Sequence, residues 1–131
     1  MEQFNLEIIS PEKSILIKND TEEVVIPAIE GYMGILKDHI PLISFLKPGI
    51  IDVKSSNENL NFYVDDGIVE FKDNTLSILT SNIFDLKKID RIRIDKIVQD
   101  AEEELKKENI KDEERFILDQ KILALNSIRS N

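Results

Sequence analysis

The single histidine of this 131-residue chain, His39, is the side chain best suited to acid–base chemistry near neutral pH. Asp38 precedes it and Ser44 follows nearby, so the three residue types match those of a serine hydrolase triad. Neighbouring residues of an extended strand point to opposite faces, however, and the chain has no Gly-x-Ser-x-Gly nucleophile motif. We therefore expect no catalytic residue here, and predict a loop histidine that hydrogen-bonds the backbone.

Acidic residues are the other candidates for chemistry. Asp65 and Asp66 resemble paired carboxylates, but Gly67 follows them, and this combination favours a hairpin turn. Glu102–Glu104 are consecutive in a helical pattern, so their side chains fan around the axis and do not converge on a metal ion. Cysteine is absent, which excludes thiolate nucleophiles and sulfur-ligated zinc. We predict no metal site, no required cofactor and no stand-alone enzyme.

The charge of the chain is uneven. The net charge of −9 argues against nucleic acid as a partner, and all of it comes from residues 1–86, whereas residues 87–131 are balanced. The apolar runs are too short to span a membrane, so no direct membrane insertion is expected. The first twenty residues lack the features of a secretory signal and are too acidic for a mitochondrial presequence, so we expect the mature chain to begin near Met1.

Up to about Thr80 the apolar residues recur with a period of two, in short runs separated by turn residues. The turns predicted from Asn, Asp and Gly are Asn57–Asn59, Asp65–Gly67 and Asp73–Asn74. This pattern predicts an antiparallel β-sandwich of eight to ten strands, or a barrel. The residues expected to alternate inward are Phe4, Leu6, Ile8, Ile15, Ile17, Val24, Ile26, Ile51, Val53, Phe62, Val64, Val69, Phe71, Leu76 and Ile78.

After Phe84 the glycines and prolines cease and the apolar spacing becomes three and four. One helix is predicted around Ile94–Leu105, ending near Asn109, and a second helix begins where Asp112 can serve as its cap. The short linker makes them antiparallel neighbours. We therefore expect two domains, a β-sandwich over residues 1–86 and a C-terminal antiparallel two-helix hairpin over residues 87–131.

Residues 30–49 hold three of the four glycines, two of the four prolines and the only histidine. Gly31 and Gly34 lack the lysine and the helix start of a phosphate-binding loop, so they predict a bent, close-packed backbone instead. Pro41 and Pro48 fix φ and remove hydrogen-bond donors at strand edges. Together these residues predict a stiff edge of the sandwich.

The segment VIPAIEGYMGILKDHIPLISFLKPGIIDV resembles the signature segment of the ε subunit of F-type ATP synthases, and VDDGIVEFKDNTLSILTSN resembles its glycine-bearing strand pair. The order of parts, a β domain followed by a helical hairpin, is also that of the family. The matching residues of the first segment are Glu30, Gly31, Gly34, His39, Pro41, Leu42, Lys47, Pro48 and Gly49.

The resemblance implies that this edge contacts the membrane-embedded ring of c subunits and that a face of the same domain packs on the γ subunit. Tyr32 stands where relatives often carry a carboxylate, so an apolar contact there replaces a charged one. The residues expected at the ring or γ contact are Glu30, Gly31, Tyr32, Met33, Gly34, His39 and Pro41.

The resemblance also implies regulation by the helical hairpin. In the family the hairpin folds against the sandwich or extends toward the catalytic β subunits, where it hinders ATP hydrolysis, and in some members ATP stabilises the folded form. IDRIRI matches the family's nucleotide motif except that Ile94 replaces its alanine. ATP is thus expected as a regulatory ligand only, and the residues predicted to bind it are Ile89, Asp90, Arg93, Arg115 and Arg129.

These expectations define one function and one alternative. The function is that of a non-catalytic rotor subunit in the central stalk of a proton-translocating F-type ATP synthase, coupling c-ring rotation to γ. The alternative is a nucleotide-sensing module whose main task is an ATP-dependent switch of the helical hairpin. In either case the resemblance implies a peripheral protein on the cytoplasmic face of a bacterial inner membrane.

Overall fold

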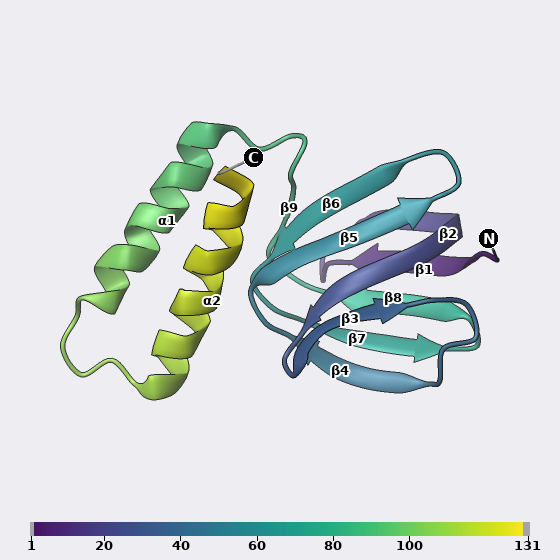
Figure 1. Cartoon of the computed structure of the whole chain (residues 1–131), viewed down its shortest axis with the longest axis horizontal. Coiled ribbons are helices and arrows are strands. Elements are labelled where there is room, and N and C mark those ends of the chain that lie inside the picture. The colour runs from purple at the N-terminus through teal and green to yellow at the C-terminus, as the bar shows by residue number, and fades with distance from the viewer. Residues whose placement is uncertain (1, 130–131) are drawn as a thin grey trace.

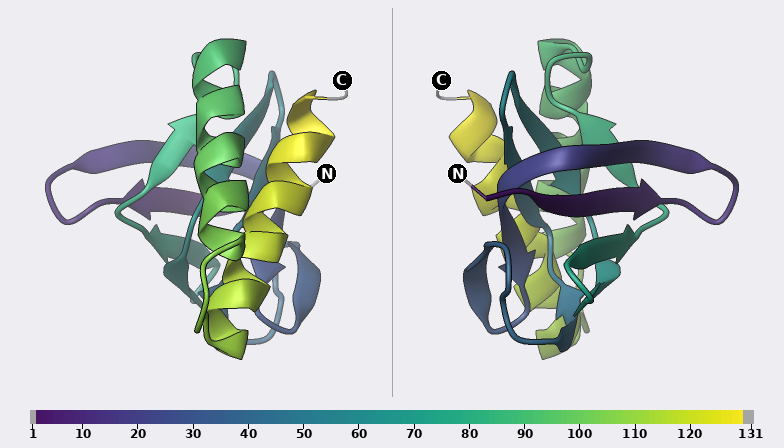
Figure 2. Two further views of the ribbon diagram at one scale, coloured as in Figure 1. Left: turned by 90° about the vertical axis from the view of Figure 1, so that its left-hand side faces the viewer. Right: turned by 90° about the vertical axis from the view of Figure 1, so that its right-hand side faces the viewer.

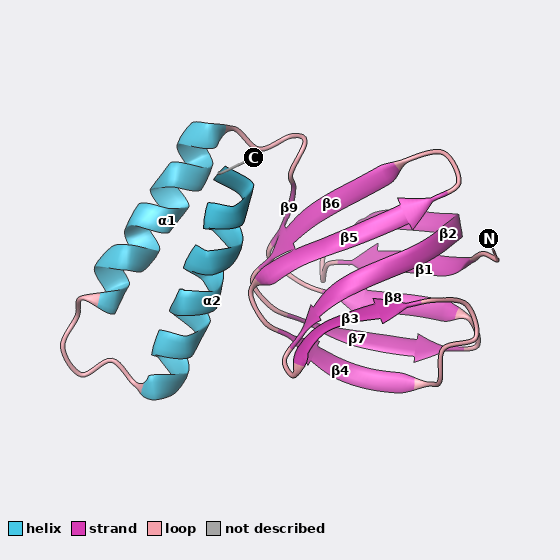
Figure 3. Cartoon of the chain, viewed as in Figure 1, coloured by secondary structure: helices cyan, strands magenta, loops and turns pink. Residues whose placement is uncertain are grey.

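The computed structural model describes residues 2–129 of the protein (Figure 1). Within that range a set of nine strands precedes two helices, as the sequence predicts (Figure 3). The elements are β1 (Phe4–Ile9), β2 (Ser14–Ala28), β3 (Gly31–Ile35), β4 (Leu42–Leu46), β5 (Gly49–Ser55), β6 (Asn59–Val64), β7 (Gly67–Lys72), β8 (Thr75–Leu79), β9 (Ile83–Asp85), α1 (Arg91–Leu105) and α2 (Asp112–Arg129).

The strands form one sheet that folds over into a sandwich. Their order is β1-β8-β7-β4-β2-β5-β6-β9, with β3 paired to β2 and with β1 also paired to β2. All pairs are antiparallel except β1–β8, in which Leu6 lies opposite Leu76 in a parallel register. These two strands are joined by most of the domain instead of a tight turn, and such a long connection allows them to run in the same direction.

The core lies between the two layers and contains the alternating residues predicted for it, with one clear exception. Ile17 is 66% exposed, although Val24 and Ile26 further along β2 are fully buried. The first part of β2 pairs only with β1, and this two-stranded ribbon projects beyond the sandwich (Figure 2). Ile17 lies opposite Glu7 on the outer face of this ribbon, and its neighbour Leu16 packs against the core instead, so the period-two pattern placed Ile17 on the wrong face.

The predicted turns have mixed outcomes. Asp73 and Asn74 have φ values of 51° and 55° and close the β7–β8 hairpin as expected. Asp65–Gly67, predicted as a hairpin, instead joins β6 to β7, which do not pair with each other because β6 bonds to β5 and β9 and β7 bonds to β4 and β8. β5 and β6 do pair across Asn57–Asn59, but none of these residues has a positive φ.

The glycines of the 30–49 segment serve different purposes. Gly31 has a φ of 139°, which side chains rarely adopt, yet a Cβ there would meet nothing within 4 Å. Conformation therefore requires this glycine, and the predicted close packing at Gly31 is wrong. A Cβ on Gly34 would lie 3.4 Å from Glu23 Oε2, an ordinary contact. Close packing occurs at Gly49, where a Cβ would lie 2.5 Å from Cβ of Pro27.

Replacing Gly49 by alanine is expected to destabilise the sandwich by about 1–3 kcal/mol, because the ring of the buried Pro27 cannot move aside without shifting β2. The midpoint of urea unfolding measures this loss. Gly34→Ala is the matched control and is expected to be neutral or slightly stabilising, since it reduces the freedom of the unfolded chain without a clash. Equal effects of the two substitutions would contradict this account.

Both helices form, with ends that differ slightly from the prediction. The carboxylate of Asp90 caps α1 by accepting a hydrogen bond from the backbone N–H of Arg93 at 2.8 Å. α1 ends at Leu105, earlier than expected, and Asn109 adopts a φ of 63° in the linker. Asp112 is already inside the first turn of α2, where its negative charge interacts favourably with the helix dipole.

The helices lie side by side and cover one end of the sandwich (Figures 1 and 2). Their facing side chains form a second apolar cluster that includes Tyr63 of β6 and Phe84 of β9. These two aromatic residues are direct partners across the β6–β9 pair, and their rings stack at 6.0 Å. The buried helix residues of this cluster are Ile94, Val98, Ala124 and Leu125.

Candidate functional site

His39 lies in the loop between β3 and β4 and takes part in no triad. Its Nδ1 donates a hydrogen bond to the carbonyl oxygen of Ile40 at 2.7 Å, and its ring meets the edge of Phe71 at 5.9 Å. Ser44 donates instead to Glu30 Oε2 at 3.2 Å. The prediction of a loop histidine bonded to the backbone is confirmed.

The residues predicted at the ring or γ contact fall into two groups. Glu30, Gly31 and Tyr32 lie at the start of β3, beside the helices, whereas His39 and Pro41 lie in the loop beyond the other end of the strand (Figure 1). Gly31–Ile35 spans roughly 13 Å at the usual rise of a strand. The structure therefore does not gather the predicted residues into one spot, and their role in a contact stays a prediction.

Tyr32 is fixed in place by β5. Its hydroxyl accepts a hydrogen bond from the backbone N–H of Ile50 at 3.1 Å, and the missing Cβ of Gly49 makes room for it. Tyr32 also borders a cavity of about 570 Å³ whose other side is formed by Ser127 and Ile128 of α2. Met33 is half-buried against the core, and Gly34 is exposed on the same strand. The end of the hairpin thus lies next to Tyr32.

An apolar surface that the sequence analysis did not identify covers the outside of three neighbouring strands. We call it the β4–β7–β8 face, and it consists of Ile43, Phe45, Ile68 and Leu79, with exposed fractions of 70%, 60%, 44% and 46%. Phe45 lies directly opposite Ile68, and Ile68 directly opposite Leu79. Three apolar side chains therefore form a continuous row across the sheet, which is typical of a protein-binding surface.

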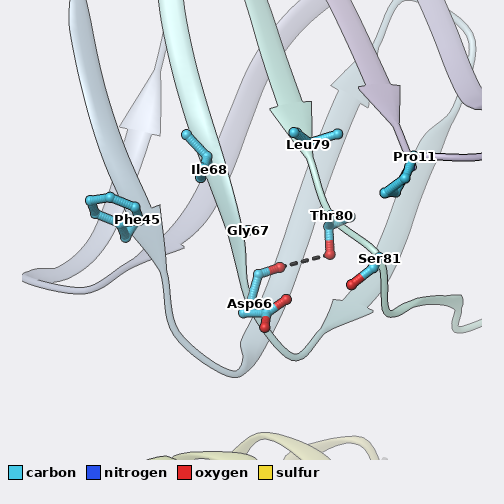
Figure 4. A pocket seen from close by; sticks show the side chains of 8 residues that line it. All are labelled: Pro11, Phe45, Asp66, Gly67, Ile68, Leu79, Thr80 and Ser81. Carbon is cyan, nitrogen blue, oxygen red and sulfur yellow. Dashed lines mark hydrogen bonds between the residues drawn. The ribbon is translucent and has the colours of Figure 1, made fainter.

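A shallow cavity of about 340 Å³ lies within this face (Figure 4). The side chains of Phe45, Ile68 and Leu79 line it together with Pro11. Its lower rim is held by a hydrogen bond of 2.7 Å from the hydroxyl of the buried Thr80 to the carbonyl oxygen of Asp66. The cavity is therefore formed by regular strands and a bonded rim, so it exists before any partner binds.

A signal for this face is present in the sequence. In an ordinary strand with one solvated side only every second residue is apolar. In β4, Leu42 and Leu46 face inward while Ile43 and Phe45 face outward, so both phases of the strand are apolar. Strands with apolar residues on both faces are typically covered on both faces. This pattern indicates that another protein covers the outer face of β4.

The residues predicted to bind ATP are already engaged with other groups. Ile89 packs against the helix cluster, and the carboxylate of Asp90 caps α1. Asp90 therefore bonds the backbone N–H of Arg93 at the start of the helix. The guanidinium of Arg93 lies over the ring of Phe84, 4.8 Å from its centroid.

The two arginines of α2 lie at opposite ends of the hairpin. Arg129 is near the start of α1, where it forms an ion pair of 3.0 Å with Asp95. Arg115 lies in the first turns of α2, and because the helices are antiparallel it is remote from the IDRIRI motif. Ile94, which stands in place of the motif's alanine, is buried in the helix cluster. Of the predicted residues, Ile89, Asp90, Arg93 and Arg129 therefore lie at one end of the docked hairpin and Arg115 lies at the other.

Tyr63 is a fully buried tyrosine with one polar contact, a hydrogen bond of 2.8 Å from its hydroxyl to Oδ1 of Asp65. Burial, followed by the negative charge of Asp65, raises the pKa of the Tyr63 hydroxyl well above its ordinary value of 10. The folded pKa thus exceeds the unfolded one, so this contribution to stability is complete below about pH 10 and is lost as the pH rises above it.

We therefore expect stability above pH 10 to fall more steeply in the natural chain than in Tyr63→Phe, by up to about 1.4 kcal/mol per pH unit. Urea unfolding at pH 9, 10 and 11 measures the difference. The raised pKa values of paired lysines such as Lys96 are shared by both proteins and cancel in the comparison. If the free energy of unfolding fell equally with pH in the two proteins, Tyr63 would ionise without unfolding of the chain.

Comparisons with known proteins agree with this architecture. The family model of the ATP synthase delta/epsilon chain β-sandwich domain matches residues 3–85. An ATP synthase epsilon chain of Pelagibacter ubique (strain HTCC1062) is 54% identical over 127 residues, which cover 97% of this chain and 98% of the relative. The chain therefore belongs to the ATP synthase delta/epsilon family and resembles its epsilon chains over nearly its full length.

Solved structures share the fold at lower identity. A chain in the Euglena gracilis mitochondrial ATP synthase, solved as OSCP/F1/c-ring in rotational state 1, superposes with a TM-score of 0.76 at 20% identity, over 98% of this chain and 80% of that one. A chain of the central stalk and c-ring of the Tetrahymena thermophila enzyme gives 0.65 at 16% identity, over 96% of each. In the described part of this chain, neither helix is long and apolar enough to cross a membrane.

Proposed function

We propose that the chain is a non-catalytic rotor subunit of an F-type ATP synthase that couples rotation of the c-ring to the γ subunit. The observation that carries this proposal is the β4–β7–β8 face, an exposed apolar surface on a preformed sheet in a chain of the delta/epsilon family. Such a surface transmits force only if it stays bound and does not deform. Its row of apolar side chains favours binding, and the three paired strands beneath the row resist deformation.

The γ subunit is the partner we assign to this face. Exposed apolar side chains at the centre and charged ones at the edge, Glu70 and Lys72, are the usual arrangement of a stable interface. For the c-ring we assign the loop beyond β3, where Ile40 is 74% exposed beside His39. A ring contact that also includes Tyr32 must extend along the whole of β3.

Co-expression of the chain with γ and the c subunit tests this proposal. We expect the chain to co-purify with γ alone, and with the ring when γ is present. Recovery of the chain free of both partners, under conditions in which γ and the ring associate with the rest of the enzyme, would overturn the assignment. The proposal also places the chain peripherally at the cytoplasmic face of a bacterial inner membrane, where a rotor subunit of this kind works.

Regulation by residues 87–131 is the second part of the proposal. The hairpin has its own apolar cluster, and it meets the sandwich of residues 1–86 through Tyr63, the β9 segment and β5. It can therefore leave without opening the sandwich core, and an extended hairpin would reach the catalytic β subunits and restrain hydrolysis. Removal of residues 88–131 should raise the ATPase activity of the assembled complex, and unchanged activity would eliminate this role.

The nucleotide-sensing alternative has weaker support. To hold a triphosphate, Arg93 must leave the ring of Phe84 and Arg129 must leave Asp95, and the buried Ile94 stands where the motif has alanine. We therefore propose ATP as a regulatory ligand only of a rearranged hairpin, and no cofactor of the docked form. Binding of labelled ATP to the isolated chain at low millimolar concentration is expected to be absent, and saturable binding there would restore the alternative.

A further inference from the structure

One carboxylate oxygen joins the helical hairpin to the sandwich. Oδ1 of Asp65, in the β6–β7 connection, accepts the hydrogen bond from the hydroxyl of Tyr63 at 2.8 Å. The same oxygen lies 3.3 Å from Nζ of Lys121 on α2. A strand residue, a loop residue and a helix residue therefore meet at a single atom.

The contact is partly shielded from water. Tyr63 is fully buried, and the side chains of Lys121 and Asp65 are only 25% and 27% exposed. By contrast, the Lys96–Asp100 pair on α1 has side chains that are 70% and 55% exposed. Water and salt screen a partly buried pair much less than an exposed one, so added salt weakens the Asp65–Lys121 contact less than the Lys96–Asp100 pair.

Within residues 2–129 this is the one ion pair between α2 and the sandwich. The other ion pair of α2, between Arg129 and Asp95, joins the two helices to each other and not to the sandwich. The apolar cluster supplies most of the buried area, but burial of apolar surface is non-directional. The position of α2 along the sheet therefore depends on Lys121 reaching Asp65.

We propose that Asp65 is a latch that holds α2 on the sandwich, and that loss of its contact with Lys121 shifts the hairpin toward the released position. This inference rests on the regulatory function proposed above, in which the hairpin moves. Tyr63 keeps the carboxylate of Asp65 oriented toward the helix, so that the latch is formed before α2 docks. A docked hairpin without Lys121 leaves the largely covered charge of Asp65 without an opposite charge, which favours release.

Thiol labelling of the isolated full-length chain tests the latch. The chain contains no cysteine, so Ala124→Cys introduces a single thiol that the docked hairpin buries. Two helices of this length are marginally stable in water without the sheet, so release exposes the thiol to a reagent. We expect Asp65→Asn and Lys121→Met each to raise the labelling rate about fivefold, because each removes one partner of a partly shielded ion pair.

The matched control is Lys96→Met, which removes an exposed ion pair confined to α1 and should leave the labelling rate unchanged. The double variant Asp65→Asn with Lys121→Met should label little faster than either single variant, because both remove the same contact. Rates equal to that of Lys96→Met, or effects of the two substitutions that multiply, would overturn the latch. Because Lys121 lies on the helix surface, its variant tests the latch even if Asp65→Asn disturbs the sandwich.

The assay contains no γ subunit, ring or catalytic subunit. A failure in it therefore refutes the latch and leaves the proposed function intact. Conversely, removal of residues 88–131 without an effect on hydrolysis would refute the regulatory function while the labelling result stands.

Discussion

Ile68→Glu is expected to weaken binding of the γ subunit by about 2 kcal/mol or more, at least about 30-fold, while leaving the isolated chain folded. Ile68 is the middle of the row that runs from Phe45 to Leu79, so the new carboxylate would be buried without a partner at the centre of the interface. In the free chain the side chain is exposed to water and the charge has little cost. Titration of labelled γ with the purified chain measures the affinity.

Ile17→Glu is the matched control for this prediction. Ile17 is an exposed isoleucine on a strand, but it lies on the projecting β1–β2 ribbon and outside the β4–β7–β8 face. The affinity for γ should therefore be unchanged, and the unfolding midpoints of both variants should stay close to that of the natural chain. Equal loss of affinity in the two variants would show that γ does not bind at this face.

Leu125→Ala is expected to release the hairpin while the sandwich remains folded. Leu125 is fully buried in the cluster between the helices and β6, and the loss of a buried leucine side chain costs about 3–5 kcal/mol. A two-helix hairpin held by one small apolar cluster is only marginally stable. Amide hydrogen exchange measures the result, with protection lost in α1 and α2 and retained in the sandwich core.

Leu123→Ala is the control on the same helix, because Leu123 is 65% exposed two residues away. Its effect on protection should stay within about 0.5 kcal/mol. If Leu125→Ala removed protection from Leu6, Ile26 and the rest of the sandwich core as well, the hairpin and the sandwich would be one cooperative unit. The separate movement proposed for residues 87–131 would then be untenable.

The strands and helices were predictable because their signals are local. The buried apolar residues of β5 and of β8 are spaced by two, and Ile94, Val98 and Ala101 recur at helical spacing. The features that differed depend on contacts between distant segments. One is the parallel pairing of β1 with β8, and the other is the crossing of Asp65–Gly67 from one layer to the other. Both depend on which strands pair, and the residues of a turn do not determine strand pairing.

In the candidate site, too, the local features were predictable and the contacts between distant segments were not. The glycine and proline positions of residues 30–49 were readable from the sequence, but the separation of Tyr32 from His39 by the length of β3 required the fold. The β4–β7–β8 face left a trace in the two apolar phases of β4, which do not fit a strictly alternating pattern. The latch at Asp65 had no sequence signal, because Lys121 lies 56 positions further along the chain.

One pairing of β1 has a mechanical consequence. Because β1 bonds to β2 on one side and to β8 on the other, the strands β1, β8, β7, β4 and β2 form a closed circuit. It is completed between β2 and β4 by the pairing of Ala28 with Leu46 and by the 2.9 Å hydrogen bond from Ile29 N–H to the Phe45 carbonyl. A closed circuit offers no free edge from which a twisting load could peel strands one at a time. Such a load is shared by all five strands, so the circuit resists deformation as one rigid unit.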